Sequence, residues 1–168
     1  MAHGLTRSLL PHFVPGARPI SSAIYGTVSV IAVVVIGAHG ASGAGEVLLF
    51  AAVSMVVIWG IHVYASVLAE AGTTGLHWRV ALRAGLRDEM GVIEGATAPL
   101  AVLLLGSLGV LDDSTAIWAS VWCGVGLLTL MPSVWLRRIG SGWWQCVMAS
   151  AVAGLFGLLL VALKVFVH

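Results

Sequence analysis

Five long apolar segments divide the chain, and the stretches between them are short and rich in glycine or charged residues. The segments cover approximately residues 20–38, 47–71, 90–111, 116–136 and 143–167. A helix needs about 20 mostly apolar residues to cross the hydrocarbon core of a bilayer, and each segment is close to that length or longer. The pattern predicts an all-α polytopic membrane protein, whose single domain, residues 20–167, is a five-helix transmembrane bundle.

A shorter amphipathic segment, at about residues 76–88, separates the second predicted span from the third. In it Arg79, Arg83 and Arg87 recur at helical spacing beside an apolar stripe that begins with Trp78. Such a helix typically lies in the membrane interface with its apolar face in lipid. We therefore predict an interfacial helix whose arginines bind anionic lipid head groups, although arginines in a cytoplasmic loop also occur for topological reasons alone.

Composition agrees with the membrane class and argues against others. With 60% hydrophobic and only 9% charged residues, the chain lacks the charged surface that a soluble domain of 168 residues would present. The net charge of +1 gives no support for nucleic-acid binding. The excess of arginine over lysine, together with abundant alanine, glycine and valine, indicates a bacterial protein. We therefore expect an integral protein of the bacterial inner membrane.

The distribution of charge along the chain predicts its orientation. In a five-span arrangement seven of the eight basic residues fall on one side of the membrane, and only Lys164 falls on the other. The seven are Arg7, Arg18, Arg79, Arg83, Arg87, Arg137 and Arg138. Because cytoplasmic loops are enriched in arginine and lysine, we predict a cytoplasmic N-terminus, with residues 1–19 as a cytosolic tail, and a C-terminus outside.

Polar residues gather in the cytoplasmic half of the predicted bundle. The second span carries His62, Ser66 and Glu70 at intervals of four residues, which places them on one face of a helix. By position along their spans, Glu94 in the third helix and Tyr25 in the first lie in the same half of the membrane. An ionisable group in hydrocarbon costs at least about 2.5–3.5 kcal/mol on insertion scales, so it usually faces a wet cavity or a bundle interior and marks a functional site.

These residues predict an ion or proton pathway that opens toward the cytoplasm, in a channel or a small transporter. Glu94 and His62 form its central pair, because a carboxylate attracts cations and an imidazole exchanges protons near neutral pH. Glu70, Tyr25 and Ser66 support that pair.

A proline in the third predicted span supports a functional site close to Glu94. Pro99 has no N–H to donate to the carbonyl of Gly95, so the helix is expected to leave that acceptor free for a donor, a water or a cation close to Glu94. Pro99 can equally serve only to kink the helix.

Other interpretations of the polar residues stay open. They can hydrogen-bond across helices simply to hold the bundle together, in which case the protein is a non-catalytic accessory or structural subunit that docks lipids or partner proteins. Imidazole and carboxylate groups also suit several divalent metals, but the spacing matches no diagnostic motif, so we predict neither a metal nor another cofactor. The chain has no nucleophile elbow, no HExxH motif and no glycine-rich phosphate loop, and we expect no enzyme.

The small number of spans also favours self-association. A five-helix protomer has little interior in which to build a pathway, so an ion-conducting protein of this size is expected to be a homo-oligomer. The fifth span places Ala149, Ala153 and Gly157 on one face, a small-residue seam that permits close helix contact within the protomer or between subunits.

Overall fold

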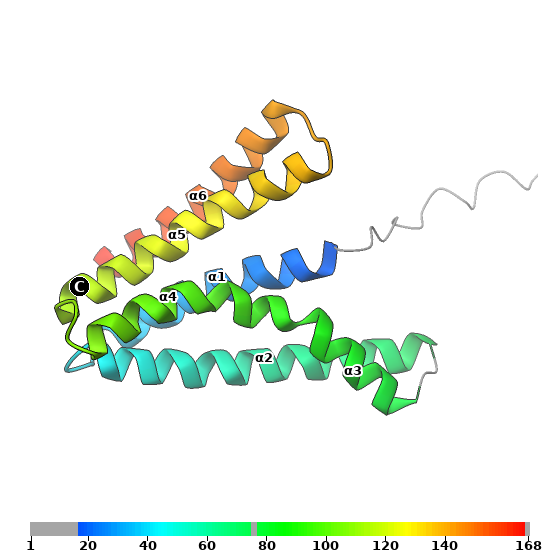
Figure 1. Cartoon of the computed structure of the whole chain (residues 1–168), viewed down its shortest axis with the longest axis horizontal. Helices are drawn as coiled ribbons and strands as arrows, with labels where there is room; N and C mark the ends of the chain where they lie inside the picture. The colour runs from blue at the N-terminus through cyan, green and yellow to red at the C-terminus, as the bar shows by residue number, and fades with distance from the viewer. Residues whose placement is uncertain (1–16, 75–76, 167–168) are drawn as a thin grey trace, which may run out of the picture.

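The computed structural model describes residues 17–74 and 77–166, and the side chains of residues 20–72 and 77–162. The predicted cytosolic tail falls mainly on residues 1–16, and the predicted fifth span ends at residue 167, so these parts of the prediction lie outside the described residues. Six α-helices follow one another (Figure 1): α1 (Ala17–Gly37), α2 (Ala44–Thr74), α3 (Trp78–Asp88), α4 (Met90–Ser107), α5 (Asp113–Arg138) and α6 (Trp143–Phe166).

Five helical stretches are long and apolar enough to cross a membrane, and the described part of the chain contains no β-strand. The helices α3 and α4 count together as one of the five, since only Glu89 separates them. The predicted all-helical class with five long apolar helices is therefore confirmed, and such helices suggest a membrane protein. A helix also occupies the position expected for the interfacial segment, at Trp78–Asp88.

Three helices form the centre of the molecule. The helices α1, α2 and α4 lie side by side, α5 packs against α4 and α1, and α6 packs mainly on α5 (Figure 1). The core between them is filled by aliphatic side chains, of which Ile31, Met55 and Leu103 are among the largest. The α5–α6 hairpin meets α1 and α4 at one end of the molecule and diverges from them toward the other.

The two ends of the bundle carry opposite charge. The end at which α2 and α5 finish, here called the basic end, carries five exposed arginines. They are Arg79, Arg83, Arg87, Arg137 and Arg138. The opposite end, here called the acidic end, carries Glu46, Asp112 and Asp113.

The helices α1 and α4 cross at two glycines, where their backbones nearly touch. A Cβ atom on Gly26 would lie 2.2 Å from the carbonyl oxygen of Val92, and one on Gly95 would lie 2.2 Å from the carbonyl oxygen of Ala23. Small residues let membrane helices approach this closely, and any side chain at either position would force the two helices apart.

A glycine in the left-handed conformation ends α4 earlier than its apolar sequence predicts. Gly109 has a φ of 75°, and the N–H of Val110 donates to the carbonyl of Leu105 at 3.0 Å. This is the Schellman arrangement, which satisfies the last carbonyls of a helix, and Gly140 ends α5 in the same conformation. The helix α4 therefore ends four residues before the C-terminal limit of the predicted span 90–111.

At the acidic end, the start of α2 is hydrogen-bonded to α5. The carboxylate of Asp113 accepts a hydrogen bond from the N–H of Ala44 at 2.9 Å. Glu46 reaches back to accept a bond from the N–H of Ser42 at 2.8 Å. Acidic groups at a helix N-terminus also interact favourably with the helix dipole, so α2 begins three residues before the predicted start of its span.

Candidate functional site

The centre of the site is Glu89, the single residue between α3 and α4. Its backbone ends one helix and begins the next, and its N–H donates to the carbonyl of Gly85 at 3.0 Å. Its carboxylate makes no capping bond to α4, and its side chain is only 15% exposed. The carboxylate is thus held against the rest of the bundle at a helix N-terminus, where the helix dipole favours negative charge.

Two side chains of α2 contact the carboxylate of Glu89. The hydroxyl of Ser66 donates to Oε1 at 2.5 Å. The Nδ1 atom of His62 lies 3.6 Å from Oε2, which is longer than a hydrogen bond but within the range of an ion pair. Because His62 and Ser66 are four residues apart, both project from one face of α2. The ion pair exists only when the imidazole is protonated, so its strength depends on pH.

Tyr25 of α1 completes the group. Its ring centroid lies 4.3 Å from that of His62, with the two planes tilted by 48°. Tyr25, His62, Ser66 and Glu89 therefore come from α1, α2 and the α3–α4 junction, and together they form the His62–Glu89 cluster. The imidazole is 32% exposed, so the neighbouring helices do not enclose it completely.

Three of the five predicted pathway residues, Tyr25, His62 and Ser66, belong to this cluster. Glu70 lies one turn beyond Ser66 on α2 and is half-buried. No group of three or more His, Cys, Asp or Glu side chains among the described residues is arranged to hold a metal ion.

Glu94 lies elsewhere. Its side chain is exposed, and it makes no hydrogen bond or ion pair with another described residue. It is five residues beyond Glu89, which rotates it by about 140° around α4. The carboxylate that approaches His62 is therefore that of Glu89, which lies between the predicted interfacial segment, residues 76–88, and the predicted span 90–111. The available signal was the acidic pair Asp88 and Glu89 directly before an apolar run, a typical helix N-terminus.

The carbonyl that Pro99 leaves without a backbone donor has a partner. The hydroxyl of Thr27, fully buried on α1, lies 3.1 Å from the carbonyl oxygen of Gly95 and 2.9 Å from that of Ala23. The expected donor thus comes from a neighbouring helix. This contact stabilises the close crossing of α1 and α4.

One buried donor near the cluster has no acceptor in the part of the chain that the structure describes. The indole N–H of Trp59, one turn before His62 on α2, is buried without a hydrogen-bond partner among the described residues. The ring itself packs against the apolar core. A lone buried donor costs about 1–3 kcal/mol, so Trp59 is a weak point of the packing.

The other predicted features fall at the edges of the bundle. Arg79, Arg83 and Arg87 are all exposed on α3, and the guanidinium carbon of Arg79 lies 5.6 Å from the ring centroid of Trp78. In the small-residue seam of α6, a Cβ atom on Gly157 would lie 3.1 Å from Val125 of α5. At Gly157, the seam therefore makes a contact within the protomer.

Comparison with known proteins adds no assignment: the chain matches no protein-family model, no curated protein and no solved structure. Its function must therefore be inferred from the geometry of its own residues.

Proposed function

We propose that this protein handles protons in the bacterial inner membrane, as a channel or small transporter in which His62 exchanges the proton. The observation that carries the proposal is the approach of Nδ1 of His62 to within 3.6 Å of a carboxylate oxygen of Glu89, on otherwise apolar helices. Ionisable residues inside membrane segments commonly form proton relays.

Each member of the cluster has a role in this proposal. Glu89 stabilises the imidazolium when His62 takes up a proton, and Ser66 holds the carboxylate in place through its 2.5 Å hydrogen bond. Tyr25 presents its ring 4.3 Å from the imidazole, and an aromatic face at this distance attracts a cation. The protonated and neutral forms of His62 therefore differ in their contacts, as a group that alternates between two states requires.

The positive-inside rule supports a cytoplasmic location for the basic end, with the N-terminus inside and the C-terminus outside. In this orientation the cluster opens toward the cytoplasm, and α3 lies on the membrane surface with its exposed arginines near anionic head groups.

Glu94 supports a homo-oligomeric assembly. An exposed carboxylate on a membrane helix is costly in lipid, and contact with a second copy would remove Glu94 from the lipid. We therefore keep Glu94 and Glu70 as candidate residues of an ion pathway between copies.

Proton flux into proteoliposomes tests the proposal. Vesicles containing the purified protein and a pH-sensitive dye are energised with a potassium gradient and valinomycin. We expect His62→Gln and Glu89→Gln to lower proton flux by about tenfold or more, the factor that a charged partner worth about 1.5–3 kcal/mol provides. His39→Gln is the matched control, since it makes the same substitution at an exposed histidine next to the acidic end.

Two results would remove the proposal: no proton flux by the native protein under any gradient, or flux that neither cluster variant changes. Glu94→Gln, measured in parallel, locates the route. A loss of flux there, with Glu89→Gln unaffected, would move the pathway from the His62–Glu89 cluster to the outer face of α4.

A second function, that of an accessory subunit, is favoured by the position of α6. This helix packs mainly on α5 and leaves most of its apolar residues exposed, a surface suited to a partner membrane protein. Purification in mild detergent separates the two functions. A stable complex with a larger unrelated protein would favour the accessory subunit, whereas a homo-oligomer that transports protons would exclude it.

A further inference from the structure

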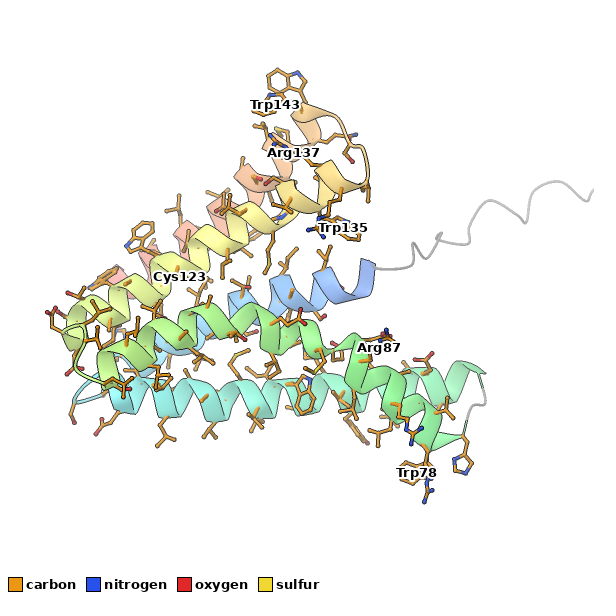
Figure 2. The ribbon with its side chains drawn as sticks, in the orientation of Figure 1. Trp78, Arg87, Cys123, Trp135, Arg137 and Trp143 are labelled. Atoms are coloured by element: carbon orange, nitrogen blue, oxygen red, sulfur yellow. The ribbon has the colours of Figure 1, made fainter. Side chains whose placement is uncertain are left out.

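The break between α3 and α4 is bonded to a side chain of another helix. In a continuous α-helix the N–H of Val92 would donate to the carbonyl of Asp88, but here it donates to the carbonyl of Glu89 at 3.1 Å. The carbonyl of Asp88 accepts a hydrogen bond from the hydroxyl of Ser22 on α1, also at 3.1 Å. Figure 2 shows the change of direction between the two helices at this point, next to Arg87. Ser22 is therefore bonded to the peptide group that joins Asp88 to Glu89.

The close crossing of α1 and α4 fixes the position of Ser22. Gly26 follows Ser22 by four residues on the same face of α1, and Val92 follows Asp88 by four residues. A Cβ atom on Gly26 would lie 2.2 Å from the carbonyl oxygen of Val92, so the two backbones are already in contact there. Ser22 is only 6% exposed. Its hydroxyl is thus presented to the carbonyl of Asp88 from a buried, closely packed helix face.

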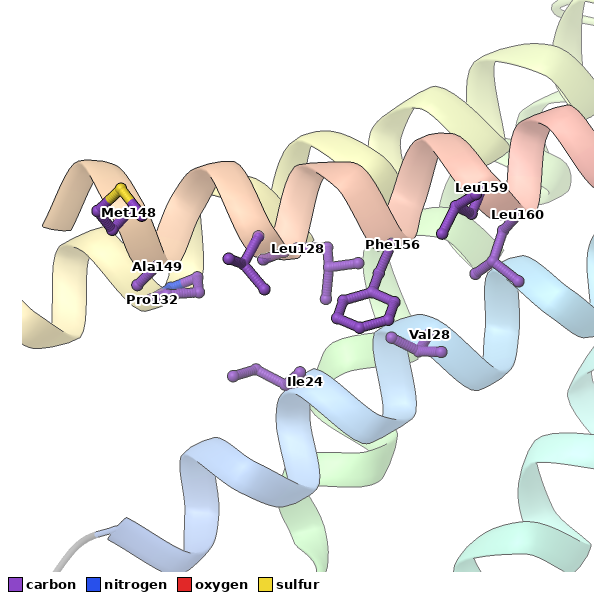
Figure 3. Close-up of a pocket in the computed structure, with 11 residues that line it drawn as sticks. Ile24, Val28, Leu128, Pro132, Met148, Ala149, Phe156, Leu159 and Leu160 are labelled. Carbon is purple, nitrogen blue, oxygen red and sulfur yellow. The ribbon is translucent and has the colours of Figure 1, made fainter. Parts of the chain in front are cut away.

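The other side of α1 is loosely packed. Figure 3 shows Ile24 and Val28 of α1 facing Phe156 of α6 across an apolar crevice of about 830 Å³. The helix α1 therefore packs closely on α4 and only loosely on α6. The bond from Ser22 lies on the closely packed side, so this part of α1 positions the α3–α4 junction rather than α6.

The helix α2 holds the junction from a second direction. Gly85 of α3 lies four residues before Glu89, and its carbonyl accepts the N–H of Glu89 at 3.0 Å. A Cβ atom on Gly85 would lie 3.1 Å from Cγ2 of Val67 and 3.4 Å from the carbonyl oxygen of Val63, both on α2. Glycine at this position therefore lets α3 lie directly against the turn of α2 that follows His62.

We propose that Ser22 and Gly85 are positioning residues for the His62–Glu89 pair, which hold the α3–α4 junction so that the carboxylate of Glu89 faces α2. Ser22 keeps the Asp88–Glu89 peptide out of a continuous helix. Without this bond the peptide rotates toward the α-helical geometry, which moves the carboxylate relative to His62. The effect on transport rests on the proposed function, whereas the effect on the distance between His62 and Glu89 does not.

The ring nitrogens of His62 provide a readout that needs no transport. The full-length protein is prepared with isotope-labelled histidine, reconstituted in lipid and measured by NMR at constant pH, and His62→Gln assigns the signals. Because the imidazole signals respond to the nearby carboxylate of Glu89, Ser22→Ala should shift them. Ser29→Ala makes the same substitution about two turns further along α1 and should leave them unchanged.

The variant Glu89→Ala shows whether Ser22 acts through the carboxylate. In that background Ser22→Ala should leave the His62 signals in place, because the group that Ser22 positions is gone. In proteoliposomes Ser22→Ala should lower proton flux about threefold, the factor that corresponds to an average hydrogen bond between membrane helices, and should lower it no further in the Glu89→Ala protein. No shift of the His62 signals by Ser22→Ala, or an equal shift in both backgrounds, would overturn the proposal.

These outcomes are distinguishable from those of the proposed function. A native protein without proton flux, whose His62 signals shift with Ser22→Ala only when Glu89 is present, would remove proton transport and retain the positioning role. Proton flux that depends on Glu89 but not on Ser22, with unchanged His62 signals, would do the reverse.

Gly85→Ala covers the case in which Ser22→Ala does not fold. Its added methyl group would lie 3.1 Å from Val67, so α3 is pushed away from α2. The His62 signals should shift in this variant. They should stay in place in Gly72→Ala, the matched control, where a Cβ atom meets nothing within 4 Å. His62 signals that Gly85→Ala leaves unchanged would show that the junction does not set the position of the carboxylate, and would refute the proposal.

Discussion

Replacing Thr27 with valine tests how the bundle compensates for Pro99. The hydroxyl of Thr27 is fully buried and lies 3.1 Å from the carbonyl oxygen of Gly95, which Pro99 leaves without a backbone donor. Valine has nearly the same shape and no donor, so the substitution removes the hydrogen bond and leaves the packing in place.

Two kinds of measurement limit the free energy of unfolding that Thr27→Val is expected to remove. A buried acceptor that loses its partner costs about 1–3 kcal/mol, but hydrogen bonds between membrane helices average about 0.6 kcal/mol and reach about 1.7 kcal/mol. The single proton of Thr27 is also shared with the carbonyl of Ala23, 2.9 Å away. We therefore expect Thr27→Val to lower the free energy of unfolding by about 1 kcal/mol.

Combining Thr27→Val with Pro99→Ala gives a double-mutant cycle. Alanine restores the N–H that donates to Gly95, so in this background Thr27→Val should cost at least about 0.5 kcal/mol less than in the native protein. The assay is reversible unfolding in mixed micelles of a mild and a denaturing detergent, followed by circular dichroism. Thr27→Ser, which keeps the hydroxyl, is the control. An equal cost of Thr27→Val in both backgrounds would refute the assignment of Thr27 as the replacement donor.

Three further predictions concern other contacts. The pKa of Asp112 is lowered from its ordinary value of 3.8, chiefly by the hydrogen bond from the Thr115 side chain. Asp112 therefore contributes to stability above pH 3.8, and this contribution is lost as the pH falls through the lowered native pKa. Thr115→Val should raise this pKa, as NMR titration of the carboxyl measures, and an unchanged value would contradict the assigned cause. Asp113→Ala should cost about 1 kcal/mol of unfolding free energy, because it removes the side-chain cap on the N–H of Ala44, and faster hydrogen exchange at the start of α2 should accompany it. Trp59→Phe should be neutral or stabilising in detergent unfolding, since it removes a buried N–H that has no partner among the described residues; a loss above about 2 kcal/mol would mean that the indole N–H is satisfied.

Runs of apolar residues predict where the helices lie. The exact ends of the helices depend on capping residues, which hydropathy does not reveal. Runs of apolar residues predict α1, α2, α5 and α6 within a few residues. The end of α4 differs because Gly109 adopts a positive φ, although Val110 and Leu111 continue the apolar run. The position of Gly109 could have been used to predict the end of α4. Its left-handed conformation ends the helix, although apolar residues follow it.

The composition of the site was only partly predictable, because position along a helix gives depth but not the neighbour that a side chain faces. His62 and Ser66 share a face through their spacing alone. Which carboxylate meets that face depends on how α4 is rotated, and that rotation is set by tertiary packing. The contact of Gly95 with α1 fixes it, placing Glu94 outside and leaving Glu89 to approach His62.

The same crossing makes the His62–Glu89 distance sensitive to the position of α3. Close contact at Gly26 and Gly95 limits how far α1 and α4 can rotate against each other, since rotation that brings a neighbouring side chain into the crossing would clash with the facing backbone. Glu89, however, is also the C-terminal cap of α3, and its N–H donates to the carbonyl of Gly85 in that helix. A change in the angle between α3 and α4 must therefore be absorbed by the backbone of Glu89 itself. The carboxylate would move relative to His62 while the rest of the bundle stays in place.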